Sequence, residues 1–222
     1  FRTLDKHKIE KAFDEVGSSS LSQEAQQELK AVAKSSANEK RVLLEIEKGD
    51  AFFEKNDLDT AIACYSHAIR LDPIHVDAYY KRAIAHGKLK NIANEIADYG
   101  TVIQLDIDHA EAHNRLGVSY ANQGNINIAI TNFSEAIRIN PAFVEAYNNR
   151  AVAFANQGEI NKTITDLTQA IKLNPDNPDA YFNRAIIYNN TQQFDAAVND
   201  FTETIRANPE HARAYMSRAD IF

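Results

Sequence analysis

The chain has 222 residues, 44% of them hydrophobic and 25% charged, a balance typical of folded soluble proteins rather than disordered or membrane-spanning ones. Its formal net charge of −7 disfavours nucleic-acid binding, which depends on neutralising phosphates, and no apolar run is long enough to span a bilayer. The single cysteine, Cys64, excludes a disulfide framework and a multi-cysteine metal site, and it slightly favours a reducing, cytoplasmic compartment.

Residues 1–41 do not share the pattern of the rest of the chain. Two apolar stripes with helical spacing, over residues 4–16 and 25–33, predict two short helices. Ser36 and Glu39 have the spacing of a capping box, which predicts that the next helix begins there. We expect residues 1–41 to form a helical extension that caps the part that follows. The alternative is a regulatory segment that occupies a binding surface.

From residue 42 onward the sequence repeats with a period of 34 residues. Pro73, Pro141, Pro175 and Pro209 stand 68, 34 and 34 residues apart, and Ile107 falls midway in the double gap. This register divides the chain into five full units and the first part of a sixth, with the bounds 42–75, 76–109, 110–143, 144–177, 178–211 and 212–222.

Each unit predicts a pair of antiparallel helices. In the third unit Ile126, Ala129, Ile130 and Phe133 follow the spacing of one helix face, and Gly124 stands where the preceding helix would end. A small residue recurs early in every unit, where it lets two helix backbones approach closely while aromatic rings fill the space beside them. One hairpin cannot bury its apolar face alone, so neighbouring units must stack.

The repeat resembles the tetratricopeptide repeat family. Segments such as Tyr147-Asn148-Asn149-Arg150-Ala151 and the stretch 136–141 are typical of that family, and the resemblance covers residues 42–222. It implies an all-α fold, a right-handed α-solenoid of antiparallel helix pairs. It further implies that the first helix of each pair lines a concave groove that binds peptides or partner proteins.

The second unit departs most from this pattern. It has Glu95 at a packed alanine position, Gly100 inside a helix and Ile107 in place of proline. A buried glutamate needs a partner, which Lys88 or His86 could supply. We favour the other reading, in which Glu95 leans into solvent.

The resemblance places polar residues along the groove. Lys81, Lys88 and Arg115 would make its middle basic and favour an acidic stretch of ligand. Because a carboxamide both donates and accepts, Asn149 and Asn183 could bracket a backbone amide of the ligand, an arrangement similar to the asparagine ladder of the O-GlcNAc transferase repeats. The alternative is that these side chains are solvated residues on an exposed face. The remaining groove candidates are Asn114, Asn122, Asn148, Asn156 and Asn190.

A second comparison argues against one kind of ligand. Chaperone adaptors with this repeat bind a C-terminal carboxylate through a clamp of basic and amide residues. The corresponding positions here are Ile46, Asp50, Lys81, Glu111 and Arg115, of which only the last matches. Asp50 and Glu111 would repel a carboxylate, so we predict that this chain does not bind such a terminus.

Other residues that could carry chemistry are better explained by structure. An arginine recurs just before the small residue, and we expect it to cover rings and pair with acidic groups. His109 and His113 have helical i, i+4 spacing but no evident third ligand, and Cys64 lies in a core-like stretch. No phosphate-binding glycine loop or nucleophile elbow is present. The sequence therefore predicts no enzyme activity, metal or cofactor.

We expect a protein-interaction scaffold or adaptor that binds an extended peptide or a partner protein in the groove. One alternative is a self-assembly module, suggested by the apolar Ile221 and Phe222 in the unmatched helix at 212–222. Another is a targeting or regulatory domain of a larger enzyme. The chain is expected to continue past Phe222, since a solenoid needs a polar capping helix.

Overall fold

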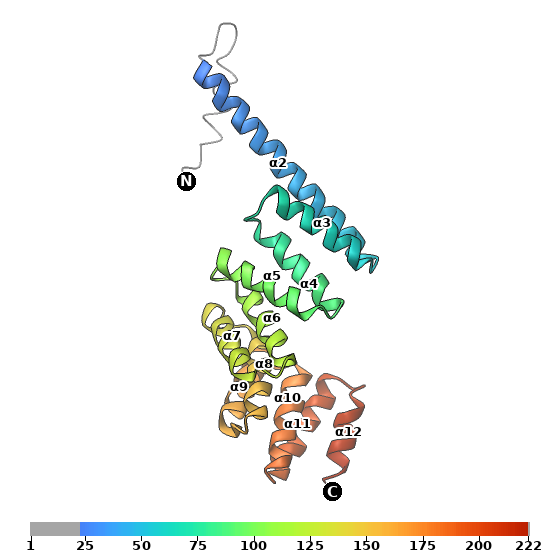
Figure 1. Ribbon diagram of the computed structural model, residues 1–222. Helices are drawn as coiled ribbons and strands as arrows, with labels where there is room; N and C mark the ends of the chain where they lie inside the picture. Colours follow the sequence, from blue (N-terminus) through green and yellow to red (C-terminus); the bar gives the residue numbers. More distant parts are fainter. Residues whose placement is uncertain (1–22, 222) are drawn as a thin grey trace.

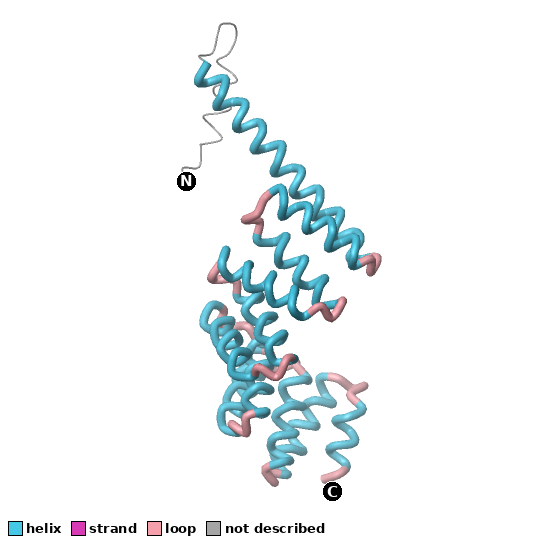
Figure 2. The backbone as a smooth tube through the Cα atoms, viewed as in Figure 1, coloured by secondary structure: helices cyan, strands magenta, loops and turns pink. Residues whose placement is uncertain are grey.

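The computed structural model describes the backbone of residues 23–221 and the side chains of residues 34–221. Within residues 23–221 every regular element is an α-helix, and short turns join the helices into a curved array of antiparallel pairs (Figures 1 and 2). The all-α solenoid expected from the sequence is confirmed. The helices are α2 (Gln23–Glu54), α3 (Leu58–Leu71), α4 (Val76–Lys88), α5 (Ile92–Leu105), α6 (Ala110–Asn122), α7 (Ile126–Ile139), α8 (Val144–Asn156), α9 (Ile160–Leu173), α10 (Pro178–Asn190), α11 (Phe194–Ala207) and α12 (Ala212–Ala219).

The helices follow the 34-residue spacing of the sequence. Five first helices, α4, α6, α8, α10 and α12, begin at residues 76, 110, 144, 178 and 212. Each packs against the second helix of its own unit or of the unit before it, in the nearest-neighbour manner of a solenoid. Within the described residues, none of these helices is long and apolar enough to cross a membrane.

The N-terminal side differs from the expectation. Helix α2 runs without a break for 32 residues, so its first part continues directly into the first helix of unit one (Figure 1). Ser36 and Glu39 lie inside this helix, where backbone N–H groups already have carbonyl partners, and the predicted capping box is therefore wrong. The helix expected over residues 4–16 lies outside the described residues.

The turn between the two helices of a unit uses one left-handed residue. Gly124 and Gly158 have φ of 80° and 74°, as expected for glycine after a helix end. Asn56, Lys90 and Gln192 occupy the same repeat position at φ of 59° to 60°. The sequence indicates this left-handed conformation only at the two glycines, because Asn, Lys or Gln at the same position does not by itself predict a positive φ.

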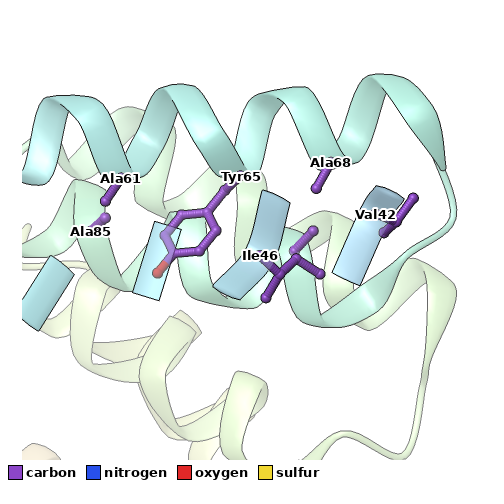
Figure 3. Close-up of a cluster of buried hydrophobic side chains, with 7 residues drawn as sticks. Val42, Ile46, Ala61, Tyr65, Ala68 and Ala85 are labelled. Atoms are coloured by element: carbon purple, nitrogen blue, oxygen red, sulfur yellow. The ribbon is translucent and has the colours of Figure 1, made fainter. Parts of the chain in front are cut away.

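The core of each pair consists of a ring packed against a small residue. In Figure 3 Tyr65 points from α3 into a cluster with Ile46 of α2 and Ala85 of α4. A side chain on Gly49 would collide with the Tyr65 ring, so the close approach of α2 and α3 depends on that glycine. In unit three, a Cβ on Gly117 would lie 2.6 Å from Cε1 of Phe133.

We expect Gly117→Ala to destabilise the protein by roughly 1 kcal/mol, since the overpacking penalty exceeds the gain in helix propensity. Gly100→Ala is the matched control, because Gly100 lies inside α5 with no atom within 4 Å of an added Cβ. That change should stabilise by about 0.5–1 kcal/mol. The stability of both variants would be measured by urea unfolding. A shift of the unfolding midpoint in the same direction for both would contradict this explanation of the packing.

The recurring arginines bridge neighbouring units. Arg150 donates from Nε and Nη2 to the two carboxylate oxygens of Asp166 at 2.7 and 2.8 Å, and from Nη1 to Ser134 of the preceding unit at 3.0 Å. Arg82 and Arg184 make the equivalent contacts, each with the aspartate of its own unit and a hydroxyl of the preceding unit, and hydrogen bonding to the paired aspartate raises the pKa of both. Arg150 also lies over the Tyr147 ring, so the structural reading of the arginine series is correct.

Unit three has none of the three residues that form this bridge. Leu116 stands in place of the arginine, Asn132 in place of the aspartate, and Gly100 in place of the hydroxyl residue of the preceding unit. All three partners change together, which avoids leaving a buried charge without its counterion.

The C-terminal end is less open than expected. Ile221 packs half-buried against the cluster that contains Phe182 and Phe201, so it does not belong to a bare apolar face. Phe222 lies outside the described residues. Tyr215 and Met216 are the exposed large hydrophobic side chains of α12.

Candidate functional site

The first helices of consecutive units lie next to each other on one side of the array. Helix α6 contacts α8, and α8 contacts α10, in addition to their contacts with second helices. Two adjoining pockets lie along α8, α10 and the start of α12. We call them the polar pocket, of about 500 Å³, and the apolar pocket, of about 240 Å³.

The polar pocket is lined mainly by amides and carboxylates. Asn148 and Asn149 come from α8 and Asn183 from α10, while Asn174 and Asn177 come from the turn between α9 and α10. The remaining lining residues are Val144, Glu145, Val152, Asp179, Phe182, His211 and Arg213.

The carboxamides of this pocket are only partly satisfied. Asn149 donates to Oδ1 of Asn114 at 3.0 Å, and Asn114 donates to Glu145 at 3.0 Å. The Oδ1 atom of Asn148 is buried and has no hydrogen-bond partner. A buried acceptor without a donor is costly, so a turn of the Asn148 carboxamide toward a ligand N–H or O–H in the pocket would satisfy a group that the protein leaves without a partner.

The apolar pocket adjoins the polar one and shares four residues with it. Val152, Phe182, Asn183 and Arg213 line both pockets. The apolar pocket alone adds a set of largely aliphatic residues, namely Ala155, Asn156, Thr163, Leu167, Ile186 and Ile187. An apolar side chain of a ligand could therefore be buried beside the open amide.

Phe182 lines both pockets and packs against two neighbouring side chains. The His211 ring lies against it with a centroid distance of 4.6 Å, and the Arg213 guanidinium lies over it at 5.1 Å. Tyr80 and His109 form the equivalent ring pair three repeats earlier, with a centroid distance of 5.0 Å and an interplanar angle of 28° against 41° for Phe182 and His211. Helical phase places Tyr80 and Phe182 on the groove face, but the sequence reasoning missed His211 and Arg213, although the recurrence of an aromatic residue and a histidine with the same spacing was a usable signal.

The predicted groove residues separate into three groups. Asn148, Asn149, Asn156 and Asn183 are brought together at the two pockets. Asn114 is only 1% exposed and serves as an internal partner of Asn149 and Glu145, so its prediction as a groove contact is wrong. Asn122 and Asn190 are exposed and lie outside both pockets.

The middle of the groove does not carry the expected free positive charge. Lys81 pairs with Asp50 at 3.0 Å, and Arg115 pairs with Glu111 at 3.2 Å. Arg115 also donates to the Tyr80 hydroxyl at 2.9 Å. The Asp50 and Glu111 carboxylates balance the charges of Lys81 and Arg115. The expectation of a basic surface for an acidic ligand therefore needs correction.

Lys88 and Ile46 have structural contacts of their own. The Lys88 ammonium lies 4.1 Å from the centroid of the Phe53 ring, which is a cation–π geometry. Ile46 is buried in the core of unit one rather than in the groove. At the positions that would form a carboxylate clamp, Lys81 and Arg115 are thus already paired with acidic groups.

The two histidines and the cysteine are engaged in local structure. His109 Nδ1 accepts from the backbone N–H of Ala112 and thereby caps α6, while His113 Nδ1 lies 3.3 Å from Oδ1 of Asn132. Burial raises the pKa of the Cys64 thiol, which disfavours its thiolate form.

Comparison with protein families identifies the repeat. A family model described as TPR repeat matches residues 49–90, 119–158 and 153–192, and a model described as tetratricopeptide repeat matches residues 190–222. The sequence matches none of the curated proteins compared with it.

Solved structures show the same architecture. The crystal structure of MamA has a TM-score of 0.69 and 25% identity, over 74% of this chain and 96% of MamA. YrrB, described as a TPR protein with an unusual peptide-binding site, has a TM-score of 0.68 and 18% identity, over 85% of this chain and 97% of YrrB. The structure of pilF of Pseudomonas aeruginosa has a TM-score of 0.72 and 14% identity, over 83% of this chain and 88% of pilF. At these lower identities the last two support the fold alone.

Because family models match more than half of its length, and its helix pairs follow one 34-residue register, the chain belongs to the tetratricopeptide repeat family.

Proposed function

We propose that this chain is a protein-interaction module that binds an extended peptide segment across the polar and apolar pockets of α8, α10 and α12. The observation that carries the proposal is the buried, unpartnered Oδ1 of Asn148, a residue that lines the polar pocket, which adjoins the apolar pocket. An extended peptide offers both complementary features within two residues, since it presents a backbone N–H beside a side chain.

The dimensions and composition of the pockets support a peptide rather than a small catalytic substrate. The two pockets adjoin along successive first helices, and amides dominate the polar one. Amide groups can bind a backbone in any sequence context, because every residue except proline has the same donor and acceptor. The solved structure of YrrB, a protein with a similar fold, is described as containing a peptide-binding site. We infer a binding role without catalysis.

The proposal predicts which amides contribute. Asn148→Ala combined with Asn183→Ala should weaken peptide binding by about tenfold to a hundredfold, the effect of losing one or two hydrogen bonds of ordinary strength. Binding would be measured by fluorescence polarisation, with a peptide selected from an array of random ten-residue sequences. Asn122→Ala is the matched control, because Asn122 is an exposed carboxamide on a first helix outside both pockets.

Two outcomes would count against the proposal. Unchanged affinity in the double variant, with an unchanged circular dichroism spectrum, would remove these amides from the site. Equal losses in Asn122→Ala and in the double variant would mean that the peptide does not distinguish the pockets from the rest of the helix surface.

A further inference from the structure

Glu95 is a carboxylate at a position that the other units fill with small buried residues. The equivalent residues are Ala61, Ala129, Thr163 and Ala197, all of which are buried in the packing between helices. Glu95 is half-buried, so the expectation that it leans into solvent is wrong. Neither Lys88 nor His86 is its partner, since Lys88 lies over Phe53 and His86 lies near Asp98.

A missing side chain on the neighbouring helix makes room for this carboxylate. A Cβ on Gly87 would lie 2.9 Å from Oε1 of Glu95, so the carboxylate occupies the space that a side chain at residue 87 would fill. The equivalent positions in the other units carry Phe53, Ala121, Ala155 and Asn189. The glycine and the glutamate therefore occur as a pair, only in unit two.

Repeat equivalence relates this carboxylate to the apolar pocket. Gly87, Glu95 and Ser119 correspond to Ala155, Thr163 and Ile187, which stand 68 residues later and all line the apolar pocket. Because stacked units repeat the same geometry, the space that is apolar between units four and five contains a carboxylate between units two and three.

The carboxylate lacks a full set of partners. The Ser119 hydroxyl lies within hydrogen-bonding reach of Glu95, but its one proton can also go to the Arg115 carbonyl at 3.0 Å, so it satisfies at most one of the carboxylate's lone pairs. The Arg115 guanidinium is engaged by Tyr80 and Glu111. Burial raises the pKa of Glu95, against the opposing effects of the Ser119 hydroxyl and the Arg115 charge. Within residues 34–221, no ion pair joins Glu95 to a basic side chain.

We propose that Glu95 forms a subsite for a cationic side chain of the bound peptide, with the planar guanidinium of arginine as the best fit. The proposal rests on the peptide-binding function above and deepens it. Arginine can donate two parallel N–H groups to one carboxylate, which would replace the donors that the protein does not provide. The ligand would then place a basic residue between units two and three and an apolar residue two repeats farther along, between units four and five.

The subsite can be tested without knowing the natural ligand. N-acetyl-arginine amide would be titrated into the isotope-labelled protein, and backbone amide shifts of Gly87 and Ser119 would be followed by NMR. N-acetyl-citrulline amide, which has nearly the same shape but no charge, is the matched probe. We expect the arginine probe to bind at least tenfold more tightly than the citrulline probe, and Glu95→Gln to abolish the difference. Equal shifts with both probes, or a preference for arginine that persists in Glu95→Gln, would overturn the proposal.

Controls separate this result from unfolding and from the wider function. The raised pKa of Glu95 means that its contribution to stability is present at low pH and lost as the pH rises through the folded-state pKa. Glu95→Gln should therefore melt no lower than the wild type at pH 7. Glu210→Gln, at an exposed turn, should leave the preference for arginine unchanged.

The peptide array distinguishes failure of the subsite from failure of the groove. Both proposals stand if the peptides that bind the wild type are enriched in lysine and arginine, and the peptides that bind Glu95→Gln are not. Binding peptides that show no such enrichment would overturn the subsite and leave the groove. If no peptide binds but the arginine probe still selects Glu95, the proposed function fails while the cation site remains.

Discussion

Asp166→Ala is expected to destabilise the protein by about 3 kcal/mol, the cost of leaving a largely buried arginine without its counterion. Both carboxylate oxygens of Asp166 accept from Arg150, and the Asp166 side chain is only 7% exposed. The loss should appear as a lower midpoint in urea unfolding. Because contacts in a solenoid join only neighbours, faster hydrogen exchange should be concentrated in α8 and α9.

Asp176→Ala is the matched control for this prediction. Asp176 also faces an arginine, Arg206, at 3.4 Å, but its side chain is 81% exposed. Such a surface pair contributes at most about 0.5 kcal/mol. Equal destabilisation by the two substitutions would contradict the view that the arginine bridges stabilise the stacking of units.

A double substitution tests whether charge pairing accounts for this loss of stability. Unit three contains Leu116 and Asn132 at the positions of Arg150 and Asp166, and it folds without the bridge. Arg150→Leu combined with Asp166→Asn should therefore recover most of the stability lost in Asp166→Ala. A double variant as unstable as the single one would mean that the carboxylate acts through something other than charge pairing.

Phe133→Ala is expected to cost about 3–5 kcal/mol, because it removes a ring from a well-packed site and leaves a cavity. The Phe133 side chain is 1% exposed and packs with Ala129 and Ala153, against the backbone of Gly117. The unfolding midpoint should fall sharply, and protection from hydrogen exchange should be lost first in α6 and α7.

Phe194→Ala is the matched control for the core prediction. Phe194 begins α11 and is 49% exposed, so truncating it should cost less than about 1 kcal/mol. If Phe133→Ala were no more damaging than Phe194→Ala, the ring–glycine contact would not be what holds α6 against α7.

Much of the fold could be predicted from the sequence because helix pairing depends on local signals. Small residues, rings and turn residues recur with one period, and each has a direct physical role in the same hairpin. The capping box at Ser36 and Glu39 was misread because a local motif does not reveal whether the chain upstream is already helical. Helix α2 extends through that motif, and its N–H groups are satisfied within the helix.

The candidate site was less predictable because it depends on which side chains meet. Helical phase predicts that Asn148 and Asn183 face the groove, and both line the polar pocket, but phase could not show that Asn149 would donate to the buried Asn114. In the same way, the list of cations did not reveal that Asp50 and Glu111 neutralise Lys81 and Arg115. Some of these pairs join residues one helix turn apart and others join residues of neighbouring units. Whether they form depends on the side-chain rotamers.

The central claim, that a peptide binds in the groove formed by first helices, is tested most directly by mapping a bound peptide onto the backbone. An array-selected peptide would be titrated into the isotope-labelled protein while amide shifts are recorded by NMR. We predict saturable changes concentrated in α8, α10 and the start of α12, around Asn148, Phe182 and Arg213. Changes confined to the second helices α9 and α11, or no saturable change for any array peptide, would contradict the account.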